Sequence, residues 1–427
     1  MNKINLYEKV GVEDERSDEE ELVESSGVDN SSWTIKDYQV TILFVLVYFG
    51  DGVELYLPGI ITQVVASELG VSSLKEGFLG IIIYATIIVT IIGSWALKGT
   101  FGKRMIIIFS LYISIISAIL CALVPNYYTL LLARAMTGIC VGLNSSTIGV
   151  FFSEQVSHNK VYSIGTSLSS VAVPLGAGWG SVLSYLIMEA LGWRVFVVAA
   201  SVPLFIPPLI LLHFFLDSKD DKKEKTTNWT EEIVVPNPGI RNLKNCAMSF
   251  LCCLQGYGGV ILLPVLLRAG NEEKTGIVGN SAVQGSQFLI LAAVHGGANL
   301  IGRIAGFSLN GRIRFSNLQP IIALGTVLCY GLLLFSPGIL GTSVIMGVAK
   351  ILYSMANFAL TLMAFDPHYN GTANLGAFAT CSSTAAFCGG IVGTALASFT
   401  APYTAVFCTF VSSCILVGVI CSITERD

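Results

Sequence analysis

Two carboxylic acids stand three residues apart inside an apolar stretch of the chain, Asp51 and Glu54. On a helix this spacing places both side chains on one face, about 4.5 Å apart along the axis. Two carboxylates that close together in a low-dielectric medium resist ionising at the same time. The pair is therefore a candidate proton carrier or a site for a cationic group. The alternative is a structural pair held by Arg134 or by backbone.

A basic residue, Arg134, also lies within an apolar stretch, with Gly138 and Gly142 on the same helical stripe. Small residues at this spacing allow a neighbouring helix to approach closely. A guanidinium group stays protonated, so Arg134 could hold the carboxylate of a substrate or counterbalance Asp51. The residue types alone favour neither role over the other.

A second buried cation is expected at Lys350, which is followed on the same helical face by Tyr353 and Asn357. A lysine at this depth could bind an anion or be switched by protonation. The alternative is a lysine that only pairs with a carboxylate.

Two further residues are candidates for the same interior. His295 lies within an apolar stretch and titrates near physiological pH, so it could relay protons; the alternative is a packing residue among glycines. Tyr257 is a candidate for the aromatic lining of a cavity.

Other charged residues fall near the ends of apolar stretches. There they could form ion pairs that close one mouth of a central pathway and break when its two sides rock. The alternative for the basic members is a role in membrane topology alone. These candidate gating residues are Lys103, Arg104, Glu154, Arg303, Arg312 and Asp366.

The composition identifies the medium that surrounds these residues. Of 427 residues, 53% are hydrophobic and 12% are charged, and the mean hydropathy is +0.71. Soluble domains carry about twice that share of charge, so an ordinary soluble enzyme is excluded. An ionised side chain at the centre of a bilayer costs about 2.5 to 3.5 kcal/mol on insertion scales. The interior charges should therefore face a watery cavity or an opposite charge.

Stretches long enough to span a bilayer set the expected fold, an all-α membrane protein with twelve transmembrane helices in two six-helix halves. The expected spans are 40–65, 77–97, 105–124, 127–152, 161–187, 193–216, 245–268, 285–309, 317–336, 338–365, 373–399 and 401–423.

The polar segments divide the chain into four parts. Residues 1–39 form an acidic tail that is expected to be disordered and cytosolic, and residues 217–244 form a polar cytosolic linker. The two halves are then 40–216 and 245–424. The distribution of Lys and Arg places both chain termini on the cytosolic side.

Several short motifs resemble the major facilitator superfamily. The run Gly102-Lys103-Arg104 is similar to part of its loop signature, although Gly99 stands where the signature has an acid. Arg134 with Gly138 and Gly142 is similar to its Arg-x-x-x-Gly-x-x-x-Gly pattern.

Within that superfamily, the chain looks most like the branch related to synaptic vesicle glycoprotein 2, a neighbour of the organic ion transporters. The residues that carry this likeness include Asp51-Gly-Val-Glu54 and Leu191-Gly-Trp-Arg194. The resemblance implies the major facilitator fold and transport of a small solute by alternating access.

The expected function is secondary active or facilitative transport of a small organic ion or zwitterion, with proton coupling left open. The alternative is a non-transporting vesicle, trafficking or receptor-like protein on a transporter scaffold. We expect no enzymatic activity, no cofactor, no metal and no nucleic-acid partner. We expect a monomer in the lipid bilayer of the plasma membrane or of intracellular vesicles.

Overall fold

The computed structural model describes residues 33–71, 73–98, 101–156, 159–216, 292–309, 315–333 and 338–365, together with positions 250, 290, 335, 384 and 388. Every regular element within these ranges is a helix. The expected linker 217–244 and the expected spans 373–399 and 401–423 lie almost wholly outside the described residues, as does the span 245–268.

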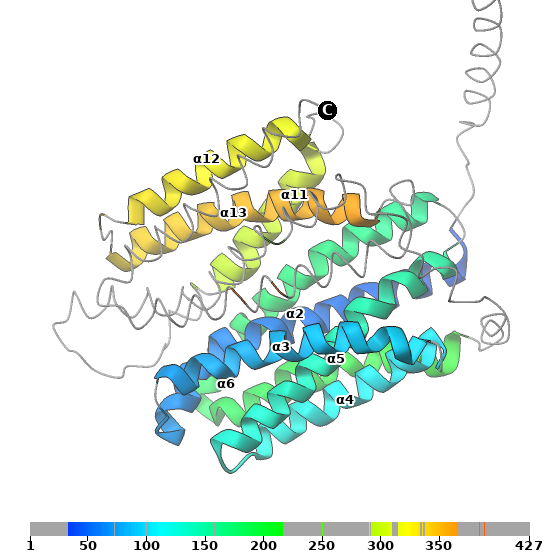
Figure 1. Ribbon diagram of the computed structural model, residues 1–427, viewed down its shortest axis with the longest axis horizontal. Helices are drawn as coiled ribbons and strands as arrows, with labels where there is room; N and C mark the ends of the chain where they lie inside the picture. Colours follow the sequence, from blue (N-terminus) through cyan, green and yellow to red (C-terminus); the bar gives the residue numbers. More distant parts are fainter. Residues whose placement is uncertain are drawn as a thin grey trace, which may run out of the picture.

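The first part of the chain forms a bundle of long helices (Figure 1). They are α2 (Ile35–Leu69), α3 (Ser73–Lys98), α4 (Lys103–Leu123), α5 (Tyr127–Gln155), α6 (Asn159–Ile210) and the π-helix η1 (Leu211–Phe215). The bundle has two ends. We name them the Lys103 end, where α2 and α4 begin, and the Glu68 end, where α2 finishes and α5 begins.

The first helix begins before the position expected from hydropathy. Residues Ile35 to Gln39 are helical, whereas the expected span starts at 40. The reason is a local cap: the Thr34 N–H donates to the Asp37 carboxylate at 2.9 Å, and the Asp37 N–H donates to the Thr34 hydroxyl at 3.2 Å. This reciprocal pair satisfies two backbone donors that the first helical turn leaves open.

The expected fifth and sixth spans join at a single residue rather than at a loop. Gly192 has φ 78° and ψ 168° and separates the two helical parts of α6. A positive φ of this kind is accessible to glycine without steric cost. The chain can therefore reverse at Gly192 and pack both parts of α6 into the bundle.

The described part of the second half consists of four elements (Figure 1). They are the π-helix η3 (Ala292–Ala298), α11 (Asn299–Leu309), α12 (Phe315–Leu333) and α13 (Gly338–Phe365). The span expected from hydropathy at 285–309 corresponds here to η3 followed directly by α11.

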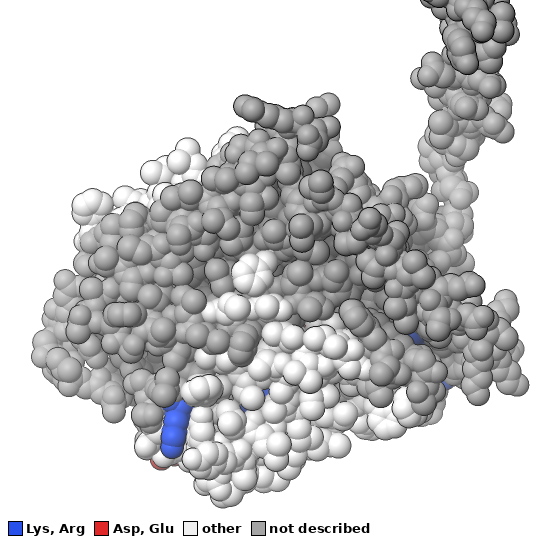
Figure 2. All heavy atoms as spheres, in the orientation of Figure 1, with Lys and Arg blue, Asp and Glu red and all other residues white. Residues whose placement is uncertain are grey.

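Five described segments are long and apolar enough to cross a membrane. Apolar side chains also cover their outer faces, for example Leu132, which is 66% exposed, and Phe214, which is 79% exposed. Figure 2 shows a described surface with very few charged atoms. An outer surface with so few charges indicates contact with lipid. The five segments are Ile35–Ile61, Lys103–Leu123, Tyr127–Gln155, Ile164–Met188 and Ala190–Phe215.

Glycines allow the helices to approach closely. A Cβ atom at Gly138 would collide with Thr86 and with the Ile83 carbonyl oxygen of α3, and one at Gly142 would lie 3.0 Å from the Ile87 carbonyl oxygen. The stripe formed by Gly138 and Gly142 therefore packs α5 against α3, as small residues do in membrane helices.

The two halves meet where α6 contacts η3, α11 and α13 and where Tyr56 of α2 contacts Asn299 of α11 and Lys350 of α13. One apolar cluster spans this contact and joins Leu57 and Phe196 to Val294 and Met346. At its tightest point, a Cβ atom built on Gly296 of η3 would lie 2.5 Å from the Cα atom of Gly178 on α6. The contact between the halves therefore depends on two glycines that face each other.

Candidate functional site

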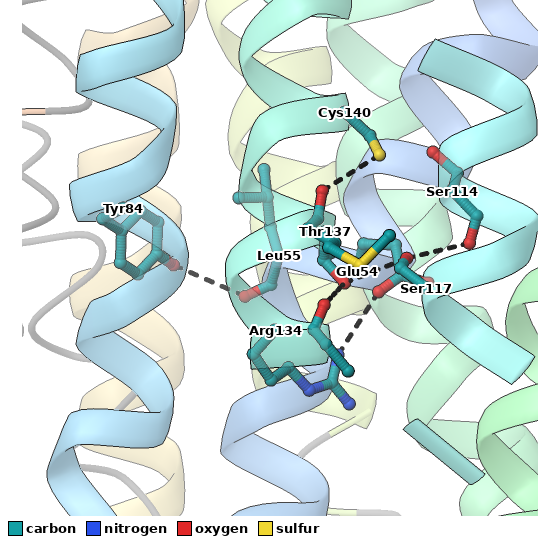
Figure 3. A network of polar contacts seen from close by, with 10 residues as sticks. Glu54, Leu55, Tyr84, Ser114, Ser117, Arg134, Thr137 and Cys140 are labelled. Atoms are coloured by element: carbon teal, nitrogen blue, oxygen red, sulfur yellow. Dashed lines mark hydrogen bonds and ion pairs between the residues drawn. The ribbon is translucent and has the colours of Figure 1, made fainter. Parts of the chain in front are cut away.

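A buried ion pair links α2 to α5 in the first half. The Arg134 guanidinium lies 3.4 Å from the Glu54 carboxylate, and each side chain is 2% exposed. Figure 3 shows Arg134 of α5 directed toward Glu54 of α2. Of the two partners considered for Arg134, Glu54 is the observed one and Asp51 is not, since the Asp51 carboxylate contacts a different residue.

The Asp51 partner is an uncharged amide. The Asn144 side-chain N–H donates to Asp51 at 2.9 Å, and the Asn144 oxygen accepts a hydrogen bond from the Ser110 hydroxyl of α4. Asp51 is 2% exposed, and Asn144 and Ser110 are fully buried. Both acids of α2 thus face α5, which agrees with their spacing on one helical face.

This first group of residues, Asp51, Glu54, Arg134, Asn144 and Ser110, is named the carboxylate cluster. Three of its atoms make no hydrogen bond within the part of the chain that the structure describes: one oxygen of Asp51, one oxygen of Glu54 and one terminal nitrogen of Arg134. Buried polar atoms are normally paired. The cluster therefore retains capacity to bind a proton or a small polar group.

A second polar group lies where the two halves meet. The Lys350 ammonium group of α13 lies 5.6 Å from the ring centre of Tyr56 on α2 and 4.8 Å from that of Tyr353. The Asn299 amide of α11 donates to the Tyr56 hydroxyl at 3.2 Å and accepts from Ser354. These five residues, all buried, are named the interface cluster.

The interface cluster joins cation–π contacts to a hydrogen-bond chain. Ammonium groups are attracted to the faces of aromatic rings, most strongly when water is excluded. Asn357 lies two turns beyond Lys350 on α13 and is 9% exposed, so the expected face of Lys350, Tyr353 and Asn357 is turned inward. The cluster therefore places a cation, two tyrosine rings and an amide where the two halves meet.

Helix α2 contributes residues to both clusters, and these residues lie on different faces of the helix. Asp51 and Glu54 contact α5, whereas Tyr56, two residues beyond Glu54, contacts α11 and α13. A separation of two residues turns the side chain by about 200° around a helix. Sequence reasoning treated the four interior charges as one set; the structure distributes them between two neighbouring clusters.

The Lys103 end holds an ion pair between α4 and α5. The Lys103 ammonium group, which is 4% exposed, pairs with Glu154, and the neighbouring Arg104 donates to the Leu212 carbonyl oxygen. Arg303 of α11 is 7% exposed. Arg312 and Asp366, the other candidate gating residues, lie outside the described residues.

Two interior candidates cannot be placed in either cluster. Tyr257 lies outside the described residues. The backbone of His295 belongs to the π-helix η3, next to Gly296, but its side chain lies outside the described part of the structure. A π-helical turn within a helix is frequent at functional sites.

The Glu68 end is held by a clasp between α2 and α6. The Glu68 carboxylate accepts hydrogen bonds from the Trp193 indole and from the Arg194 guanidinium, directly after the reversal at Gly192. Partial burial raises the pKa of Glu68, but the bonds from Arg194 and Trp193 and the Arg194 charge outweigh it. The pKa therefore lies below the ordinary value of 4.5.

This clasp predicts a pH-dependent contribution to stability. A carboxyl whose pKa is lowered by folding stabilises the folded state above about pH 4.5, and the contribution is lost as the pH falls through the lowered pKa. We expect Glu68→Gln to lower the midpoint of thermal unfolding in detergent slightly at about pH 7 and by less at about pH 3. Arg194→Gln, which removes the other partner, should show the same pattern. An equal decrease at both pH values would contradict this role.

Several residues of the two clusters were missed by sequence reasoning: Ser110, Asn144, Tyr56, Asn299 and Ser354. All are uncharged, and uncharged polar residues are common in membrane helices. For Ser110 a signal was present, because Ser110, Ser114 and Ser117 follow a helical period within an apolar span.

The fold and the two clusters define a class: a multi-pass helical membrane protein with buried charges and a polar contact between two groups of helices. Residues 40–387 match the Major Facilitator Superfamily. The chain therefore belongs to this superfamily of membrane transporters, in agreement with the motifs around Lys103 and Arg134.

Individual relatives agree with this assignment at low identity. The chain is 25% identical to svop-1 of Caenorhabditis elegans over 170 residues, which cover 39% of this chain and 32% of svop-1. It is 27% identical to synaptic vesicle glycoprotein 2B of Rattus norvegicus over 198 residues, 42% of this chain and 28% of the relative. Human synaptic vesicle glycoprotein 2A is 26% identical over 160 residues, 36% of this chain and 21% of the relative. The alignments thus span about a third or less of these relatives' own length.

Proposed function

We propose that this protein is a secondary transporter that moves a small organic ion or zwitterion across a membrane by alternating access. The observation that carries the proposal is the interface cluster, in which Lys350 of one half lies over Tyr56 of the other half at 5.6 Å. A solute bound there touches both halves, so it can favour one arrangement of the halves over another. Membership of the superfamily supports the same function.

The interface cluster serves as the solute site in this proposal. The Lys350 ammonium group attracts an anionic group, and the Tyr56 hydroxyl and the amides of Asn299 and Asn357 supply hydrogen bonds. The ring faces of Tyr56 and Tyr353 accept a cationic group. A zwitterion can use both features. Tyr257 and His295 are proposed as further lining from the second half.

The carboxylate cluster serves as the coupling site. Glu54 and Arg134 neutralise each other at 3.4 Å, whereas the hydrogen bond that Asp51 accepts within the described helices comes from the neutral Asn144 amide. Asp51 is therefore the group that we propose to gain and lose a proton. Because Asp51 and Tyr56 belong to one helix, a change at either residue can be transmitted through α2.

The gating residues close the pathway at the Lys103 end. The ion pair of Lys103 and Glu154 and the bond from Arg104 to Leu212 hold α4 to α5 and to η1. We propose that Arg303, Arg312 and Asp366 contribute the matching contacts of the second half. Breaking these contacts opens the pathway toward this face.

The proposal includes the expected organisation of the whole chain. Twelve spans in two halves, 40–216 and 245–424, follow an acidic tail, and a linker at 217–244 joins the halves. Both termini face the cytosol, and the protein acts as a monomer in the plasma membrane or in a vesicle membrane. The basic residues at the Lys103 end support this orientation.

The proposal is tested by uptake into proteoliposomes that contain the purified full chain. Labelled organic cations, anions and zwitterions are offered with and without an imposed pH gradient, and protein-free liposomes serve as the control. We expect saturable uptake of at least one solute, with a zwitterion or anion preferred. Absence of uptake for every class, with protein confirmed to be folded and inserted, would favour the trafficking or receptor-like alternative.

A substitution at Lys350 tests the solute site. We expect Lys350→Gln to raise the KM for an anionic or zwitterionic solute by about 10- to 100-fold, since a hydrogen bond to a charged group contributes about 1.5 to 3 kcal/mol. Lys350→Arg retains the positive charge, so it should raise the KM by less than Lys350→Gln does. Uptake kinetics in proteoliposomes measure both. An unchanged KM in Lys350→Gln would remove Lys350 from the solute site.

A further inference from the structure

A continuous set of buried polar contacts runs from Asp51 of α2 through α5 to α4. Asn144 donates to Asp51 with its nitrogen at 2.9 Å and accepts from Ser110 with its oxygen. Each of the three side chains is at most 2% exposed. The Asn144 amide thus forms the bridge between the acid and α4.

The Ser110 hydroxyl has two acceptors within reach but one proton. One acceptor is the Asn144 side-chain oxygen, and the other is the Ile107 carbonyl oxygen at 2.7 Å. A hydroxyl can rotate between two such acceptors, but it can donate to only one of them at a time. Ser110 can therefore occupy two hydrogen-bonded states without moving its helix.

The orientation of the Asn144 amide depends on which state Ser110 occupies. When Ser110 donates to the Asn144 oxygen, the amide nitrogen faces Asp51 and favours the ionised carboxylate. When the amide is turned by 180°, its oxygen faces Asp51 and accepts a hydrogen bond from the O–H of the neutral acid. The amide nitrogen then donates to Ser110, which donates to the Ile107 carbonyl.

We propose that Asn144 and Ser110 are positioning residues that couple the protonation of Asp51 to the direction of the hydrogen bond between α5 and α4. This inference rests on the proposed coupling role of Asp51. Protonation of Asp51 turns the Asn144 amide, and the Ser110 hydroxyl follows by exchanging its acceptor. The proton itself stays on Asp51, and no bond other than hydrogen bonds changes.

The charged and titratable groups near Asp51 are few in the described helices. Glu54 of α2 faces it and is paired with Arg134 of α5. The Cys140 thiol of α5 lies close enough to interact with both acids. Helix α6 approaches this part of α2 with the backbone of Val173, next to Gly52.

A matched control lies on the same face of α4. Ser117 is buried like Ser110, but it donates to the Ser114 carbonyl oxygen at 2.9 Å and accepts from Thr137 at 3.3 Å. Figure 3 shows Ser114, Ser117 and Thr137 beside Glu54 and Arg134. Ser117→Ala therefore removes a hydroxyl of the same burial that is hydrogen-bonded to Ser114 and Thr137 rather than to Asn144.

Infrared difference spectroscopy of the full chain in lipid reads the protonation of Asp51 directly and does not require transport. The carboxylic C=O band is recorded from about pH 4 to about pH 10, and its loss in Asp51→Asn assigns it. We expect Ser110→Ala to shift the titration midpoint of this band upward by about one pH unit, a tenfold change in proton affinity. The pH profile of uptake should shift in the same direction.

The outcomes separate this inference from the proposed function. A midpoint that is equal in Ser110→Ala, Ser117→Ala and the unmodified protein would overturn the inference, even if uptake is intact. An Asp51 band that does not titrate in this range would also overturn it. If Ser110→Ala fails to fold, Ser110→Cys, which keeps the volume and weakens the donor, takes its place and should shift the midpoint in the same direction. Absence of uptake with a shifted midpoint would contradict the transport function alone.

Discussion

Replacing Arg134 with methionine is expected to reduce uptake by about 100-fold or more. The substitution leaves the Glu54 carboxylate buried without the cation that lies 3.4 Å away. Removing one partner of a buried ion pair costs about 3 to 5 kcal/mol, which corresponds to at least two orders of magnitude in an equilibrium. Uptake into proteoliposomes and thermal unfolding in detergent measure the two consequences.

A double variant separates the loss of stability from the loss of function. Glu54→Gln with Arg134→Met removes both charges, so it should unfold at a higher temperature than Arg134→Met alone while uptake stays low. If Arg134→Met transported as well as the unmodified protein, the ion pair would have no role in transport. If the double variant recovered uptake, the pair would be structural only.

A second large loss of uptake is expected when Gly296 of η3 is replaced with alanine. A Cβ atom there would lie 2.5 Å from the Cα atom of Gly178, so Gly296→Ala must push α6 and η3 apart. Overpacking of this kind costs about 1 to 3 kcal/mol, and the separation also moves the interface cluster. We expect uptake to fall by about tenfold or more. The protein should still insert and fold, because each half keeps its own packing.

Two neighbouring glycines provide a graded control for Gly296→Ala. A Cβ atom at Gly178 would lie 3.2 Å from the Gly296 Cα atom, so Gly178→Ala should have a smaller effect. A Cβ atom at Gly297 meets no described atom within 4 Å, and Gly297→Ala should retain uptake within about twofold. Equal uptake in all three variants would show that the close contact of the halves does not matter for transport.

The bounds of the helices were largely predictable from hydropathy. The expected spans 105–124 and 127–152 correspond to α4 and α5 within a few residues. Two features of the helices could not be predicted from hydropathy. The early start of α2 depends on the pairing of Thr34 with Asp37, a polar cap that hydropathy does not register. The join in α6 depends on the positive φ of Gly192, which apolar periodicity cannot reveal.

The candidate site was predictable in its charges but not in its pairing. Asp51, Glu54 and Arg134 stand out because an ionised group is rare in an apolar stretch. Arg134 contacts Glu54 rather than Asp51 because of how far α2 is shifted along its axis relative to α5. Helix packing sets this shift. Asn144 and Asn299 carry no charge, so their contacts with Asp51 and Tyr56 emerge only when the helices are assembled.

The central claim, that the two halves open alternately toward the two faces, is tested most directly by distances between the halves at both ends. Spin labels are introduced through genetically encoded ketone residues, one pair at Phe101 and Ser308 and the other at Tyr128 and Leu340, all of which are exposed. Distances are recorded in lipid nanodiscs by double electron–electron resonance at about pH 5 and about pH 8. Alternating access predicts two distance populations for each pair, with a change in pH lengthening one pair while it shortens the other. A single fixed distance for both pairs at both pH values would contradict it.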